Sequence, residues 1–68
     1  MIVSMSSEKK SLLYRAAELR HRSIASRYRS EAALDAGDLP AFSEHRHVSS
    51  LERRVSTSFR VQGERLER

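Results

Sequence analysis

The first half of the chain carries apolar and charged residues at the spacing of a long amphipathic helix. From about Ser7 to Ala36 it holds neither proline nor glycine, and good helix formers such as Ala, Leu, Arg and Glu dominate it. On a helical wheel its apolar side chains form two adjacent ridges. The first ridge is Leu12, Ala16, Leu19, Ala33 and Leu34, joined by Ser23, Ser26 and Ser30; the second is Leu13, Ala17, Ile24, Tyr28 and Ala32.

The second half carries a narrower apolar stripe. Its members follow steps of three, four and seven residues, the spacing of a coiled-coil seam. They are Ala41, Val48, Leu51, Val55, Phe59, Gln62 and Leu66. This spacing predicts a second helix from about Leu39 to Leu66, and Gly63 predicts fraying near its end. We expect six residues to hold the two helices together: Leu12, Leu19, Val48, Leu51, Val55 and Phe59.

A short break separates the two halves. Gly37 can adopt the left-handed conformation that closes a helix, Asp38 can cap the next helix, and Pro40 suits a first helical turn. The sequence therefore predicts an all-α fold, a coiled-coil-like antiparallel hairpin of two helices over residues 7–62 with its turn at 36–39. A flexible N-terminal segment, 1–6, and a frayed C-terminal segment, 63–68, flank the hairpin.

A chain of 68 residues struggles to bury enough apolar surface to offset its conformational entropy. In addition, one stripe on the second helix covers only one of the two ridges on the first. We therefore expect the hairpin to complete a helical bundle by self-association, as a homo-oligomer, or with a partner protein. The candidate partner-binding residues lie on the second ridge and are Leu13, Ile24 and Tyr28.

Composition narrows the compartment and the class of partner. The chain has no cysteine, which excludes a disulfide framework, and no apolar run approaches the roughly 18 residues that span a bilayer. We expect a cytoplasmic protein without a membrane span. Its 13 Lys and Arg against 9 Asp and Glu give a net charge of +4, which favours acidic partners, nucleic acid included.

The residues that could bind a metal ion or act in catalysis lack the spacing that these functions require. His45 and His47 are two residues apart, which on a helix places them about 200° from each other, too far around the axis to share a metal ion. The serines lack a partnered His and Asp, and two glycines 26 positions apart cannot form a phosphate-binding loop. We predict no enzyme activity, no catalytic residues, no metal site and no cofactor.

The strongest charge cluster spans residues 20–29, which include four arginines, one tyrosine and no acid. Arg20 and Arg27 are seven residues apart on one side of the helix, and Arg22 and Arg29 are seven apart on another. Such rows can follow phosphates. The alternative to a protein-binding hairpin is therefore a dimeric RNA- or DNA-binding hairpin that uses these four arginines. A third interpretation is that the arginines only form a solvated basic face.

Two protein families share this architecture. The hairpin resembles the small co-chaperones that hold needle subunits of bacterial type III secretion systems, whose chains also turn near a glycine and carry an aromatic residue shortly after, as Phe42 does here. Through Glu8-Lys9-Lys10 and Leu34-Asp35-Ala36 it is also similar to the plasmid copy-number regulator Rop, a dimer of hairpins that binds RNA. The first resemblance implies an assembly subunit, adaptor or co-chaperone that binds a partner helix, which is our principal prediction.

Overall fold

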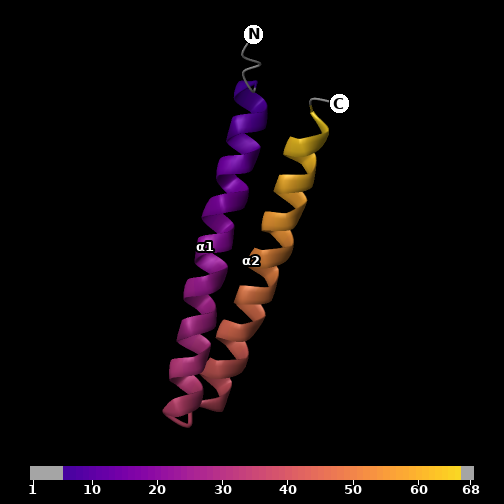
Figure 1. Cartoon of the computed structure of the whole chain (residues 1–68). Helices are drawn as coiled ribbons and strands as arrows, with labels where there is room; N and C mark the ends of the chain where they lie inside the picture. The colour runs from indigo at the N-terminus through magenta and orange to yellow at the C-terminus, as the bar shows by residue number, and fades with distance from the viewer. Residues whose placement is uncertain (1–5, 67–68) are drawn as a thin grey trace.

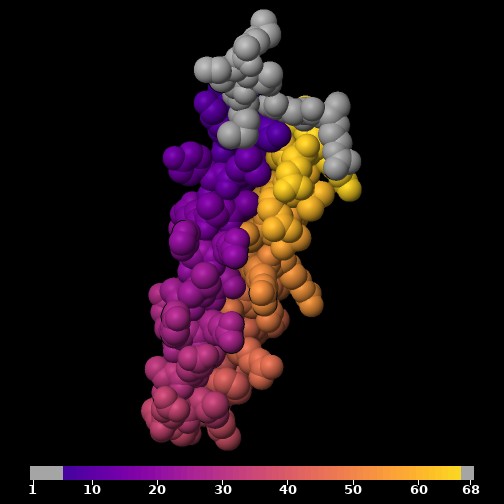
Figure 2. All heavy atoms as spheres, viewed as in Figure 1, coloured from indigo at the N-terminus to yellow at the C-terminus, as the bar shows by residue number. Residues whose placement is uncertain are grey.

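The computed structural model describes residues 6–66, and these form two long helices packed side by side in antiparallel directions (Figure 1). Helix α1 spans Ser7–Asp35 and helix α2 spans Leu39–Arg65, with no strand among the described residues. The rod they form measures 56 × 16 × 12 Å, and the side chains of the two helices meet along its length (Figure 2). The predicted all-α hairpin is confirmed.

The start of α1 follows the capping rule. The Ser6 side chain accepts a hydrogen bond from the backbone N–H of Lys9 at 3.2 Å, and Glu8 lies in the first turn, where its charge favours the positive end of the helix. The N-terminal segment predicted as flexible falls almost entirely on residues 1–5, which lie outside the described part of the chain.

The turn between the helices consists of residues 36–38 and uses the three residues that the sequence singles out. Gly37 has a φ of +75°, the left-handed conformation, and the backbone N–H of Asp38 donates to the carbonyl of Ala33 at 2.9 Å. The Asp38 carboxylate then accepts from the backbone N–H of Ala41 at 3.1 Å, and Pro40 lies in the first turn of α2. These contacts close one helix and open the next within a few residues.

The left-handed conformation of Gly37 makes the turn sensitive to a side chain at this position. A Cβ atom added to Gly37 would meet no atom within 4 Å, so the cost of a substitution comes from the backbone conformation alone. We expect Gly37→Ala to lower the free energy of unfolding by about 1 to 2 kcal/mol and Gly37→Asn by less. Denaturant titrations followed by circular dichroism measure both changes, and an unchanged midpoint for Gly37→Ala would contradict the expectation.

Small side chains line the seam between the helices. The buried residues of α1 are Ala16, Ser23, Ser26 and Ser30, and those of α2 are Ser56 and Gly63. Ala16 is the only buried apolar residue in the part of the chain that the structure describes, apart from the glycine. Because such residues lack bulk, the two backbones can approach closely.

Hydroxyl groups satisfy the polar atoms of this seam. The Ser56 Oγ donates to the carbonyl of Ala16 at 2.6 Å, and the Ser49 Oγ donates to the carbonyl of Ser23 at 2.8 Å. The Ser26 Oγ donates to the Glu52 carboxylate at 2.6 Å. Within residues 6–66, no buried side-chain oxygen or nitrogen lacks a hydrogen-bond partner. Burial of these serines therefore costs little, and their hydrogen bonds help to fix how the helices align.

The predicted role of three α2 residues in the seam is wrong. Val48, Leu51 and Val55 are 39%, 45% and 43% exposed, because Ser49 and Ser56 occupy the seam instead. The smaller residues lie in the seam because they allow the two backbones to approach more closely. As a result, α2 is rotated so that its apolar stripe lies about a quarter of a turn away from the seam. The other three predicted seam residues are half-buried at its edges: Leu12, Leu19 and Phe59.

Helix α2 continues through Gly63 to Arg65, beyond the start of the segment predicted as frayed. Gly63 is buried, and a Cβ atom at this position would lie 3.1 Å from the Leu13 Cδ2 and 3.4 Å from the Leu12 Cβ. The glycine thus has a packing role, because it lets the end of α2 lie against the start of α1. Residues 67–68 lie outside the described part of the chain.

Candidate protein-binding groove

A groove of about 700 Å³ runs along one side of the seam, between the two helices. Helix α1 supplies its apolar floor, which consists of Leu13, Ala16, Ala17 and Ile24. Polar and basic side chains from both helices complete the lining: Arg20, His21, Arg53, Ser56, Thr57 and Arg60. We call this feature the groove; no acidic side chain lines it.

Two of the three predicted partner-binding residues line the groove. Leu13 is half-buried and Ile24 is 44% exposed, and both line the floor. Tyr28, which is 68% exposed, is not among the lining residues. It lies one turn after Ile24, and four residues at 100° each place it about 40° further from the seam. The second ridge predicted from the sequence is therefore part of the groove floor from Leu13 to Ile24 and an open surface at Tyr28.

A row of arginines on α2 faces this side of the hairpin. Arg46, Arg53 and Arg60 are seven residues apart. Arg53 and Arg60 line the groove, and Arg46 and Arg53 line a hollow of about 440 Å³ nearer the turn, together with Arg27 of α1. This row was not among the residues predicted from the sequence, although its seven-residue spacing is visible there.

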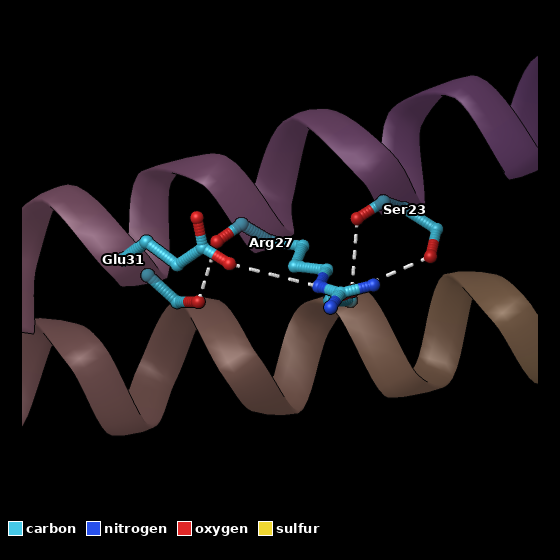
Figure 3. A network of polar contacts seen from close by, with 5 residues as sticks. Ser23, Arg27 and Glu31 are labelled. Atoms are coloured by element: carbon cyan, nitrogen blue, oxygen red, sulfur yellow. Dashed lines mark hydrogen bonds and ion pairs between the residues drawn. The ribbon is translucent and has the colours of Figure 1, made fainter.

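The arginines around the groove differ in whether they have a carboxylate partner. The Arg27 Nε lies 3.7 Å from the Glu31 Oε1, and Figure 3 shows this pair beside Ser23. The Arg60 Nε lies 4.0 Å from the Glu64 Oε1. These exposed pairs one turn apart contribute only about 0.3 to 0.5 kcal/mol each. Arg20 and Arg53 form no ion pair with the described residues, so two cations line the groove uncompensated.

The structure does not bring the four arginines of the nucleic-acid hypothesis onto one surface. Arg20 and Arg22 are two residues apart, which is about 200° around α1, so they point to opposite sides of the hairpin. In addition, an Arg22 guanidinium nitrogen lies 2.7 Å from the Glu18 Oε1. With Arg27 beside Glu31, two of the four are already paired with a carboxylate. Arg29 is exposed.

The displaced apolar residues of α2 form a second surface, which we call the α2 stripe: Val48, Leu51, Val55 and Leu66. None of them lines the groove. Arg15 of α1 lies on the same side as the α2 stripe, because its guanidinium Cζ is 5.8 Å from the centre of the Phe59 ring at the edge of the stripe. The hairpin thus presents one large apolar surface on each of its two sides.

The described residues offer little for other chemistry. No group of three or more His, Cys, Asp or Glu side chains that could hold a metal ion occurs among residues 6–66. His21 borders the groove, whereas His45 is half-buried and His47 is exposed on α2. Neither described helix has an apolar stretch long enough to cross a membrane.

Comparisons with protein-family models, with curated proteins and with solved structures find no match for this chain.

Proposed function

We propose that this hairpin is a small non-catalytic protein–protein interaction module, such as an assembly subunit, adaptor or co-chaperone, that binds a partner helix in the groove. One observation carries the proposal: among the described residues the hairpin buries a single apolar side chain, that of Ala16, while Ile24 remains 44% exposed on the groove floor. A partner helix that covers this floor would supply the apolar burial that the seam lacks.

The dimensions of the floor suit a helix. Leu13 and Ile24 are eleven residues apart on α1, which corresponds to about 16 Å at 1.5 Å per residue. A partner helix of about three turns covers that distance and can place apolar side chains at steps of three, four and seven residues against Leu13, Ala17 and Ile24. The groove walls then meet the polar flanks of the same helix.

We propose a second copy of the chain as the occupant of the α2 stripe. The charges beside this stripe have both signs, since Glu44 lies seven residues before Leu51 on α2 and Arg15 lies over Phe59. A face of mixed charge can pair with its own copy. The charged residues that line the groove are all cationic, so the groove repels a second copy with a net charge of +4. Self-association through the stripe leaves the groove open for the partner.

The proposed role of the groove is tested by an acidic substitution in its floor. Ile24→Glu should weaken a reconstituted complex with the partner by about 30-fold or more, because a buried anchor residue typically contributes at least 2 kcal/mol. The partner is first captured with the tagged chain from the native cells, after nuclease treatment, and the purified pair is then titrated. The matched control is Leu39→Glu, which changes an exposed apolar residue outside the groove and should leave the affinity unchanged.

Two results would contradict the proposal. One is a complex whose affinity does not change with Ile24→Glu. The other is capture that disappears with nuclease and falls steeply with salt, which would support the nucleic-acid hypothesis. In that case, Arg22→Gln combined with Arg29→Gln should flatten the salt dependence by about one to two units of log–log slope.

A further inference from the structure

We infer that the partner helix is acidic: an amphipathic helix with an apolar row and, beside that row, Asp or Glu residues. This inference rests on the proposed function and adds the chemistry of the partner. It follows from the different character of the apolar groove floor and of the arginines that line the groove.

The floor selects an apolar row. Leu13, Ala17 and Ile24 lie on one side of α1 and present only hydrocarbon to the groove, so a bound molecule gains there by burying its own apolar side chains. A phosphate backbone gains nothing from such a floor. A nucleic acid held by the arginines would leave Ile24 either exposed or against a charged group, which favours a peptide helix over a polyanion.

The arginines of the groove select carboxylates beside that row. Arg20 of α1 lines the groove, and so do Arg53 and Arg60 of α2. A helix that lies along the groove therefore meets guanidinium groups from both helices of the hairpin. Arg20 and Arg53 form no ion pair among residues 6–66, so they can bind a partner's carboxylates without first breaking a bond of the hairpin.

The test uses three synthetic peptides of about 16 residues with one identical row of leucines, whose flanking positions are all Glu, all Gln or all Lys. Their binding to the whole chain is measured by fluorescence anisotropy at several salt concentrations, beside a short RNA duplex. We expect the Glu peptide to bind at least about tenfold more tightly than the Gln peptide, because close charge pairs across an interface couple favourably. The Lys peptide should bind most weakly.

A charge reversal in the groove provides the decisive variant. Arg20→Glu combined with Arg53→Glu should invert the order, so that the Lys peptide binds more tightly than the Glu peptide. Ile24→Glu should weaken the binding of every peptide. The matched control is Arg29→Glu, an exposed arginine that is not among the lining residues and that should preserve the order. Circular dichroism shows whether each variant retains its helices.

Each of the remaining outcomes has a defined meaning. Equal binding of the Glu and Gln peptides, with loss on Ile24→Glu, would overturn the acidic partner and support the proposed function. Absence of binding by all three peptides, or binding that Ile24→Glu leaves unchanged, would overturn both. RNA that binds more tightly than the Glu peptide and displaces it would identify a nucleic acid as the ligand and overturn the inference.

Discussion

Ser56→Leu should abolish most of the helical structure of the isolated chain. Ser56 is buried in the seam, and its hydroxyl donates to the Ala16 carbonyl at 2.6 Å, so a leucine there forces the two backbones apart. Overpacking of this kind costs up to about 3 kcal/mol, and the hydrogen bond is lost as well. Small folds have a total stability of about 0.05 to 0.15 kcal/mol per residue, so the loss is a large part of what a 68-residue chain has. Circular dichroism melts measure it.

The same substitution on the outside of α2 is the matched control. Ser43 is exposed on α2, so Ser43→Leu should leave the melting temperature unchanged or raise it slightly, because leucine is the better helix former. Equal melting temperatures for Ser56→Leu and Ser43→Leu would show that the seam does not depend on small residues.

At micromolar concentration the chain should sediment as a dimer, and Val55→Glu should return it to a monomer. Val55 is 43% exposed at the middle of the α2 stripe, where a second copy would bury it. A buried carboxylate without a partner is strongly unfavourable, so we expect the dissociation constant to rise by about 100-fold or more. Analytical ultracentrifugation over a concentration series measures this change.

Two observations accompany that measurement. Ser43→Glu introduces the same charge on α2 away from the stripe and should leave the dimer intact. The melting temperature of the wild-type chain should rise with its concentration, because association stabilises the folded state by mass action. A helical monomer that melts cooperatively at one temperature over the whole concentration range would contradict self-association.

The parts of the fold that depend on local rules could be predicted from the sequence. Ser6, Gly37 and Asp38 have the conformations and hydrogen bonds that their residue types favour, and these decide where each helix begins or ends. The packing face of α2 could not be predicted in the same way. Hydrophobicity alone favours Val48 and Leu51, whereas the seam is decided by how closely backbones approach and by whether a buried hydroxyl finds a carbonyl on the facing helix.

The candidate site was predictable on one helix only. The ridge of α1 gives Leu13 and Ile24 directly, because their spacing alone places them on one side of the helix. The arginine wall formed by Arg53 and Arg60 depends on how α2 is rotated against α1, and that rotation follows from the serine seam. Since the seam was assigned to the larger residues, the wall could not be located from the sequence.

The repeated small residues of the seam would tolerate a second alignment of the two helices, which the turn excludes. In the observed register, Ala16 lies opposite Ser56 and Ser23 lies opposite Ser49. If α2 slid along α1 by seven residues, Ser23 would face Ser56 and Ala16 would face Gly63, again small against small. The short turn at residues 36–38 is what forbids this second register. A longer turn would make both registers accessible, and an opened turn would let α1 of one copy pair with α2 of another through the same seam.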